Sequence, residues 1–497
     1  MTRGRARSGA GPLVGPAMAA GLLTLAAPAR ADTLEEALAA AYRSNPTLLA
    51  ARAQQRGLDE SVPIAKADGR PSVQGDAQYI EFLRQAATSF TAPERGVFAG
   101  VDLSVPVYSG GAVRNAVRAA QERVEAGRAD LRATESAVFS NVVAAYMNVI
   151  RAEALVGLSQ GQVQVLSINL QATQDRFEIG ELTRTDIAQS QSRLALAQGD
   201  LRTAESNLIA AREFYIALVG EAPDDLAPPP PLPGLPDTLA TAVAVALARN
   251  PDLEAARERA QAAGFDIDVA GAGRLPRVSL FTTGDYQNFL GTLGGPVGAN
   301  VAQTTTAAQA GVRLTVPIFQ GGRPAARQRQ AQAQAAATLE NAIATERDVI
   351  RQVRAAFASY RAALALIESS QVAVAAADLS LEGVRAENSI GNRTVLDVLN
   401  AEQELVSAQA QLVTARRNAY VAGFTLLAAM GQAEARDLGL DPGTPLYDPI
   451  ANYDRVEGKW WDWSRDPDPE AQATRTVDIP PADAMIGPVD DGRSGNR

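Results

Sequence analysis

The sequence VPVYSGG, residues 105–111, joins an alternating apolar segment to a long alanine-rich one, and VPIFQGG, residues 316–322, does the same 211 positions later (316 − 105 = 211). Apolar residues at every second position predict a β-strand, whereas the alanine-rich segment that follows is typical of a helix. A proline cannot donate to the hydrogen-bond ladder of a sheet, and paired glycines permit a sharp change of direction. We therefore predict two strand-to-helix junctions, formed by Pro106, Gly110, Gly111, Pro317, Gly321 and Gly322.

Two further landmarks occur twice in the same order, NPTL (45–48) with NPDL (250–253) and IGELTRTDI (179–187) with IGNRTVLDV (390–398). A proline-rich stretch lies between the copies and can form neither a helix nor a central strand. The chain is therefore expected to hold two internal repeats. The predicted divisions are repeat 1 at 32–221, a linker at 222–237, repeat 2 at 238–435 and a C-terminal tail at 436–497.

Each repeat contains helical segments whose apolar residues are spaced seven apart, as in coiled coils. The helix expected at about 112–178 would be about 100 Å long at 1.5 Å per residue, and the one at 323–388 is similar. A shorter helix follows each. No globular core is that long, so the helices are expected to pack side by side in an extended bundle or tube. The seam residues are Val117, Val124, Leu131 and Val138 in the first long helix, and Ile343, Ile350, Phe357 and Leu364 in the second.

The segments before the long helices have a period of two and predict two β-hairpins, at about 72–108 and 277–319. One apolar and one polar face is what a membrane β-barrel strand needs, and the edge of a soluble sandwich gives the same pattern. Even a small barrel needs about eight strands, so a barrel would require two or more chains. The polar positions include Asp102, Ser104, Arg313 and Thr315.

Composition excludes several classes of function. The 497 residues include no cysteine and no histidine, which removes thiol nucleophiles, histidine bases and nearly every zinc or copper site. No Ser-x-x-Lys or phosphate-loop motif is present. We expect no catalytic residues, no metal and no cofactor. The net charge of −10 argues against nucleic acid as a partner.

The first 31 residues are expected to be an export signal. Three arginines precede a small apolar stretch, and Ala29-Arg30-Ala31 gives an A-x-A cleavage site; a disordered basic leader is the alternative. Removing 1–31 takes away four arginines and no acid, so the charge becomes −14. No later stretch has 18 consecutive apolar residues, which predicts no transmembrane helix after the signal.

The sequence resembles the TolC family of outer-membrane efflux and secretion channels. The paired NPxL segments, both junction motifs and GNRTVLDVLNAEQELVSAQAQLVTARRNAY (391–420) carry the resemblance, which covers about 33–440. It implies a mainly α fold with membrane β-strands. Four strands per chain would form a 12-stranded barrel in a homotrimer, continuous with a long α-helical tunnel across the periplasm. The implied partners are a periplasmic adaptor (membrane fusion protein), an inner-membrane RND or ABC transporter, and outer-membrane lipid.

The resemblance also implies where the tunnel closes. Thr185 and Asp186 match the gate positions of the first copy, and Arg393 matches the gate arginine of the second. Asn388 stands where the family has a gate tyrosine. Asp397 takes the first position of the acidic constriction, and Asn400 replaces the second acid. A looser gate and a weaker cation block are expected. The turns at Gly180 and Gly391 would be helix–turn–helix tips that dock the adaptor.

Three copies of Asp397 around a threefold axis would form a carboxylate ring that attracts cations. The alternative is that Asp186 and Asp397 cap the helices after the glycine turns. Each lies six residues past its glycine, so we expect both to lie inside the helix and Thr183 and Thr394 to be the caps.

Two questions stay open. KWWDW (459–463) is either a strap on the periplasmic tunnel surface or part of an aromatic membrane belt, and 466–497 is expected to be disordered. The predicted function is a passive outer-membrane exit duct of a tripartite efflux pump or a type I secretion system. The alternative is a soluble periplasmic coiled-coil adaptor or scaffold, which would need a compact, core-filled sandwich.

Overall fold

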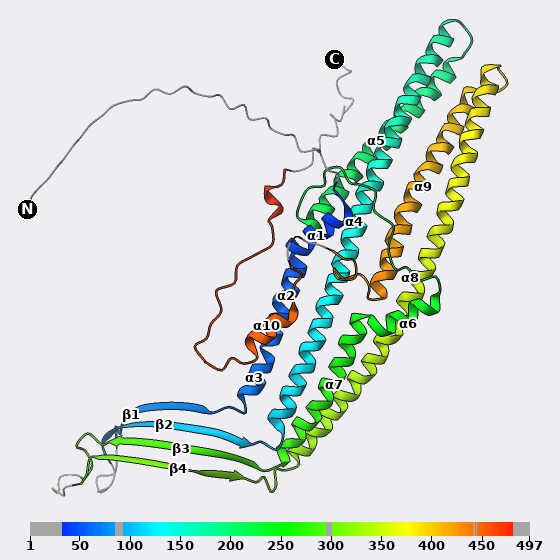
Figure 1. Ribbon diagram of the computed structural model, residues 1–497. Helices are drawn as coiled ribbons and strands as arrows, with labels where there is room; N and C mark the ends of the chain where they lie inside the picture. Colours follow the sequence, from blue (N-terminus) through cyan, green and yellow to red (C-terminus); the bar gives the residue numbers. More distant parts are fainter. Residues whose placement is uncertain (1–31, 85–92, 295–300, 441–442, 444, 481–497) are drawn as a thin grey trace, which may run out of the picture.

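The computed structural model describes residues 32–84, 93–294, 301–440, 443 and 445–480. The predicted export signal at 1–31 lies outside these residues. The helices run along one long axis, and four strands project together from one end of the bundle (Figure 1).

Two very long helices dominate the structure, and each has 67 residues, as the predictions at 112–178 and 323–388 anticipated. The helices before and after the first pair of strands are α1 (Leu34–Ser44), α2 (Pro46–Asp59), α3 (Ser61–Ala67), α4 (Ala112–Glu178) and α5 (Arg184–Val219). Those around the second pair are α6 (Leu239–Arg249), α7 (Pro251–Gly271), α8 (Arg323–Ser389) and α9 (Val395–Ala429). The C-terminal segment adds α10 (Pro449–Val456), and short 3-10 helices lie at Ala272–Arg274 and Thr476–Asp478.

The Asn-Pro motifs begin α2 and α7. The Asn45 side chain accepts a hydrogen bond from Thr47 N at 3.0 Å, and Asn250 accepts one from Leu253 N at 3.1 Å. Proline at the first helical position costs nothing, because its missing N–H would be unsatisfied there. Each asparagine also donates to a carbonyl near the end of a long hairpin, on Leu218 and Ala429, which fixes the short helices to the bundle.

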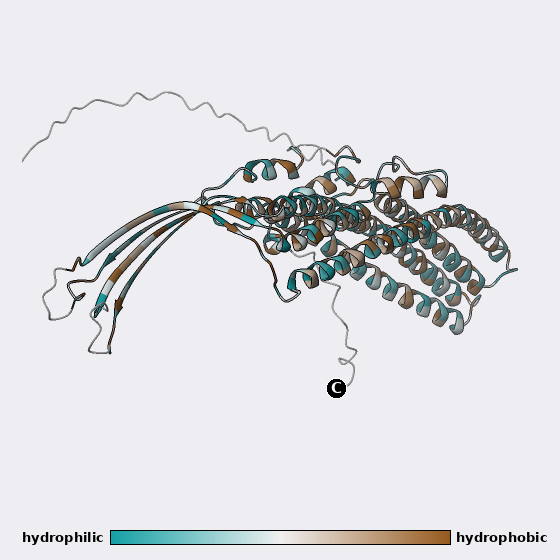
Figure 2. Cartoon of the chain, turned by 90° about the horizontal axis from the view of Figure 1, so that it is seen from below, coloured by the Kyte–Doolittle hydropathy of each residue, from teal (hydrophilic) through white to brown (hydrophobic). Residues whose placement is uncertain are grey.

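The strands form one antiparallel sheet in the order β1 (Ser72–Glu81), β2 (Arg95–Tyr108), β3 (Arg277–Asn288) and β4 (Thr304–Thr315). Pairing of β2 with β3 joins the two halves of the chain. Figure 2 shows that the sheet is a single curved layer that projects beyond the helices. Within the part of the chain that the structure describes, no helix and no second sheet packs along either face. Within one chain, the described residues therefore form no sandwich with a filled core around this sheet.

The two junction motifs differ in one respect. β2 continues through Pro106 to Tyr108, with an irregular register that lets both residues pair with β3. The strand before the second junction, β4, ends at Thr315, so the hairpin that we predicted at about 277–319 is too long at its end. The reason is that β3 begins at Arg277, opposite Thr315, and offers no partner beyond that point.

The predicted seam of the first long helix is buried at Val124, Leu131 and Val138. The predicted seam of the second is not, since Ile343 and Leu364 are 46% and 39% exposed. The buried row of α8 lies one position away and consists mainly of small residues: Val349, Ala356, Ala363, Ser370 and Ala377. Small residues let α8 approach its neighbours closely. The larger apolar residues of α8 lie on its other side and are exposed in this single chain.

By length and hydropathy, α4 and α8 each contain a window that could cross a membrane, which our count of consecutive apolar residues missed. The two criteria differ because polar residues interrupt every run of consecutive apolar residues. The many alanines still keep the mean hydropathy of each window high. Both windows lie in helices that pack lengthwise against others. The helices α4 with α5 and α8 with α9 form two long hairpins (Figure 1).

The largest core surrounds the middle of α4 and includes the proline-rich linker. Tyr146 is fully buried, and its hydroxyl donates to carbonyl oxygens of Asp32 and Ala227, at 2.9 and 2.6 Å. Leu226 of the linker is buried in the same core. The linker is thus fixed along the helices.

The C-terminal segment is also fixed where the structure describes it. Thr476, Ile479 and Pro480 line a small cavity with Ile216 of α5. The disorder that we predicted from residue 466 does not hold for Asp466, which is ion-paired, or for 476–480, and 481–497 lies outside the described residues. Turn residues and charges suggested disorder, but contacts with α5 hold the segment.

One buried carboxyl makes stability depend on pH. Burial raises the pKa of Glu434 to about 7, although Arg132 lies 3.7 Å away and opposes the shift. Since the folded pKa is raised, the stabilisation is complete below the ordinary carboxyl pKa and is lost as the pH rises through about 7. We expect the melting temperature to fall between about pH 5 and about pH 8, and Glu434→Gln to remove that part of the dependence.

Glu346→Gln is the matched control, because Glu346 pairs with Arg257 away from Glu434 and its side chain is 47% exposed. Thermal melts across the pH range check the prediction. An unchanged pH dependence in Glu434→Gln would contradict it.

Candidate functional site

The sheet has one mainly apolar and one mainly polar face across all four strands, although Phe98 and Phe281 lie on the polar face. The register places Asp102 opposite Gln74 on one side and Thr283 on the other, and Thr283 opposite Gln309. The next row on the opposite face contains Val73, Leu103, Thr282 and Ala310. Polar positions of one strand therefore pair mostly with polar positions of the next, and apolar positions mostly with apolar ones. Such a sheet can face lipid on one side and water on the other.

The strand-to-helix junctions depend on backbone that favours glycine. Gly110 and Gly111 have φ of 66° and 85°, and Gly321 and Gly322 have φ of 62° and 79°. Gly111 and Gly322 are the residues immediately before α4 and α8. The left-handed conformation turns the chain from the sheet into the helix, as the sequence predicted.

The two junctions give a matched pair of variants. A Cβ at Gly110 would lie 2.7 Å from the Leu275 Cβ, whereas one at Gly321 would meet nothing within 4 Å. Both alanine variants carry left-handed backbone strain of about 1–2 kcal/mol, and Gly110→Ala adds about 1–3 kcal/mol of crowding. We expect Gly110→Ala to lower the melting temperature more than Gly321→Ala, and equal losses in thermal melts would contradict this.

The turns at the far end of the bundle are also built on glycine. Gly180 and Gly391 have φ of 84° and 82°. In each turn a further N–H donates back to a helix carbonyl, from Glu181 to Arg176 and from Asn392 to Glu387, both at 2.9 Å. These bonds satisfy carbonyl groups at the helix end, as in a Schellman motif.

An isoleucine is exposed beside each turn. Ile179 and Ile390 immediately precede the two glycines, and each is 71% exposed. The two turns lie at the end of the bundle opposite the sheet (Figure 1).

Asp186 and Asp397 complete capping boxes at the starts of α5 and α9. Thr183 and Thr394 are the N-caps, as predicted. Asp397 Oδ2 accepts from Thr394 N at 2.9 Å and from the Thr394 hydroxyl at 2.7 Å, and Asp186 is bonded in the same way. Both aspartates lie inside their helices, as we expected, but they also take part in capping, because a carboxylate at the third helical position can reach back to the N-cap N–H.

The capping boxes keep both carboxylates charged. Hydrogen bonds from Thr394 lower the pKa of Asp397, and those from Thr183 lower the pKa of Asp186. All the bonds that the structure records fall on Oδ2, so each carboxylate still presents its other oxygen. A fixed negative charge thus stands at the start of each tip helix.

The predicted gate residues bond within their own hairpins. Asn388 donates to the Arg393 carbonyl at 2.8 Å, and Arg393 Nε donates to Glu387 at 2.7 Å. Among the described residues, no hydrogen bond or ion pair joins Thr185 or Asp186 to Asn388 or Arg393. The structure therefore does not bring the two halves of the predicted gate together in one chain.

Polar bonds between the hairpins lie elsewhere, and sequence reasoning missed them. Arg193 of α5 donates to Asn400 of α9 at 2.8 Å. Asn169 of α4 donates to both oxygens of Glu402 of α9, at 3.1 and 3.0 Å. Glu402 is only 3% exposed and also pairs with Arg385 at 2.9 Å. We call the contacts of Asn169, Arg193, Asn400 and Glu402 the interhairpin bonds.

The described residues include no group of three or more carboxylates placed to hold a metal ion.

Comparisons with known proteins agree on one family. The family model described as "Outer membrane efflux protein" matches residues 37–221 and 242–432. Outer membrane efflux protein BepC of Brucella suis is 33% identical over 435 residues, covering 87% of this chain and 92% of that protein. Alkaline protease secretion protein AprF of Pseudomonas aeruginosa is 29% identical over 317 residues, covering 62% of this chain and 64% of AprF.

A solved structure shows the same fold. The crystal structure of the outer membrane protein VceC from Vibrio cholerae is similar with a TM-score of 0.67 and 24% identity, over 80% of this chain and 96% of VceC.

Proposed function

This chain belongs to the outer membrane efflux protein family, and we propose that three copies of it form an exit duct that an adaptor and an inner-membrane transporter open. The protein is an outer-membrane channel of the kind that serves efflux and type I secretion. This family consists of transport channels rather than enzymes. The soluble adaptor alternative has no support here.

The two-faced sheet is the observation that carries the proposal. Its polar face includes Asp102 and Thr283 at the centre of the register, and its apolar face includes Val73, which is 71% exposed. No helix or second sheet of the described residues covers either face. A barrel wall satisfies both faces, because the polar face lines a water-filled lumen and the apolar face contacts lipid.

Two bare edges support a closed assembly of three chains. In one chain β1 and β4 each pair along one side only. Backbone groups left unpaired in lipid cost several kcal/mol each, so the edges must meet those of other copies. Three copies of four strands give the twelve-stranded barrel that the resemblance implies. The large apolar residues exposed on α8 support the same assembly: Leu339, Ile343, Leu364, Leu366, Val372 and Leu379.

The two-repeat organisation is part of the proposal. The two repeats, 32–221 and 238–435, would form equivalent parts of the wall of the channel, and the linker at 222–237 would join them. The C-terminal segment, 436–497, would lie along the periplasmic part. The glycine turns at the far end, with exposed Ile179 and Ile390, would receive the adaptor. Exposed apolar side chains beside a rigid turn suit contact with another protein.

Efflux is the first candidate, because the BepC relative named for efflux shares 33% identity over 87% of this chain. Secretion is the second, because AprF is named for protease secretion. Deleting the gene should sensitise the cell to small toxic compounds in the first case. In the second case it should abolish the appearance of a secreted protein in the medium.

Native mass spectrometry of the detergent-solubilised protein tests the assembly. The proposal predicts a complex of three identical chains. A monomer that is stable without detergent would contradict it.

A further inference from the structure

All three tryptophans of the chain lie in one short segment after α10. Trp460, Trp461 and Trp463 are 75%, 66% and 85% exposed. Single exposed apolar residues are ordinary, but three large aromatic rings within four positions form a patch that needs a partner. We call residues 459–464 the tryptophan loop.

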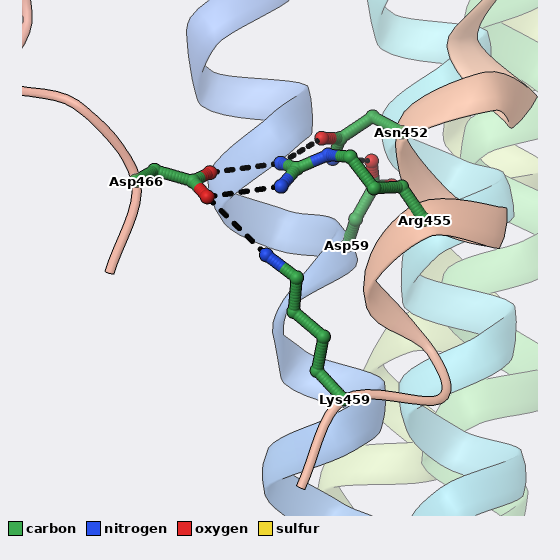
Figure 3. Close-up of polar contacts among 5 residues, drawn as sticks. All are labelled: Asp59, Asn452, Arg455, Lys459 and Asp466. Atoms are coloured by element: carbon green, nitrogen blue, oxygen red, sulfur yellow. Dashed lines mark hydrogen bonds and ion pairs between the residues drawn. The ribbon is translucent and has the colours of Figure 1, made fainter. Parts of the chain in front are cut away.

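The segment before the loop is anchored on the helices. Val456 of α10 is fully buried, and Tyr453 packs against the cluster of Val62 and Val124. Asn452 donates to the buried Asp59 of α2 at 2.6 Å (Figure 3). The loop therefore leaves from a fixed point.

The segment after the loop is fastened back to its start. Asp466 accepts from Arg455 at 2.8 and 2.9 Å and from Lys459 at 3.2 Å (Figure 3). The Arg455 guanidinium and the Lys459 ammonium lower the pKa of Asp466 to about 2, so this closure persists at any ordinary pH. The tryptophans are thus presented on a closed loop whose two ends are tied together.

The loop lies where the sheet meets the helices. Arg70 donates to the Lys459 carbonyl at 2.7 Å, and Arg70 is two residues before Ser72, the first residue of β1. Ser72 pairs with Ser104, so Arg70 lies near the level of Pro106 in β2. Trp460, the residue after Lys459, is therefore close to the helical end of the sheet.

Other exposed aromatic residues mark the same level. Tyr108 ends β2 and is 49% exposed, and Phe319 follows β4 in the second half and is 88% exposed. Membrane barrels carry girdles of aromatic residues at the two edges of their apolar band. Tryptophan prefers the headgroup region because its ring is apolar and its N–H still reaches water.

We propose that the tryptophan loop is an interfacial anchor, which inserts its three rings into the phospholipid headgroup region of the outer membrane at the helical end of the sheet. The inference rests on the membrane position of the sheet in the proposed function. It combines the two interpretations of KWWDW. The flanks form a strap on the helices, and the aromatic rings face lipid.

Intrinsic fluorescence tests the anchor directly, because the loop holds every tryptophan of the chain. The full-length protein is reconstituted into phosphatidylethanolamine–phosphatidylglycerol vesicles, with and without lipids brominated near the headgroup end of the acyl chain. We expect the brominated lipid to quench at least about half of the emission. Aqueous iodide should quench little.

Two outcomes would overturn the anchor. Quenching by iodide but not by brominated lipid would place the rings in water. Protection from both quenchers would mean that a neighbouring copy covers them. Flotation of the vesicles is measured in parallel, and a protein that does not float with them would overturn the proposed function together with the anchor.

Variants locate the insertion and its cause. Trp463→Phe, and the double variant Trp460→Phe with Trp461→Phe, report on separate parts of the loop. Arg70→Ala removes the bond to Lys459 and is expected to reduce quenching by brominated lipid at least about twofold without changing flotation. Arg123→Ala, which breaks an ion pair with Asp266 between α4 and α7, is the matched control and should leave quenching unchanged. Equal quenching in Arg70→Ala and Arg123→Ala would contradict the role of the tether.

Discussion

Replacing Asp397 with alanine is expected to weaken block of the channel by divalent cations by roughly 30- to 150-fold. In the proposed trimer three copies of this carboxylate surround one axis. At a given distance each carboxylate attracts a divalent cation about twice as strongly as a monovalent one, dissolved salt screens part of that attraction, and the loss of all three copies gives the factor stated above. Titration of magnesium or calcium from the tip side of a planar bilayer measures the effect.

Asp397→Asn separates charge from capping, because its amide oxygen can still accept from Thr394. We expect it to lose the block as Asp397→Ala does. In the wild type, hydrogen bonds from Thr394 lower the pKa of Asp397, so the charge and the block should persist as the pH falls through the ordinary aspartate pKa. Unchanged block in both variants would show that Asp397 does not line the constriction.

Cutting the interhairpin bonds is the second large effect that we expect. The double variant Asn169→Ala with Arg193→Ala removes the bonds that α4 and α5 donate to Glu402 and Asn400. Hydrogen bonds that involve a charged group contribute about 1.5–3 kcal/mol when buried and less when exposed. A combined loss of about 2–3 kcal/mol per chain would raise the population with separated hairpins roughly 30- to 150-fold.

The double variant is chosen so that the fold survives. Glu402 keeps its ion pair with Arg385 at 2.9 Å, so no buried charge is left alone. The single-channel open probability of the double variant should rise. Arg176→Ala, which breaks the exposed pair with Glu181 within one hairpin, is the control and should behave as wild type. If the double variant also matches wild type, these bonds do not hold the tunnel closed.

Asn388 and Asn400 have different partners in this protein, one within its own turn and one across the hairpins. Neither asparagine supplies the side chain that the resemblance leads one to expect. Asn388 instead closes its own turn by donating to Arg393, and Asn400 accepts from Arg193 on the other hairpin. We propose that closure in this protein rests less on the tips and more on contacts about two helical turns behind them.

Local patterns in the sequence predicted the elements of the fold closely. The hairpin predicted at about 72–108 has those outer bounds, and the long helices differ from prediction by at most one residue. A period of two or seven can be recognised from neighbouring residues alone, without knowledge of the rest of the chain. The pairing of the strands then aligns the polar and apolar positions of all four on common faces.

Prediction failed where contacts between elements decide. The capping role of Asp186 and Asp397 was missed for a different reason, because Thr183-x-x-Asp186 and Thr394-x-x-Asp397 are local capping-box patterns and our prediction considered the N-cap residue alone. Asn169, Arg193 and Glu402 carried no signal, because polar residues on a helix are usually solvated. Only the packing of α9 against the first hairpin buries Glu402 and gives it partners. The large apolar residues exposed on α8 were also mispredicted as buried within one chain. In the proposed trimer they contact other copies, whose positions the sequence does not give.

Single-channel conductance in a planar bilayer is the most direct test of the central claim. The protein is purified from outer membranes in detergent and added to the bilayer. The account predicts a trimer that inserts, conducts and favours cations. A protein that stays soluble without detergent and never inserts would contradict it.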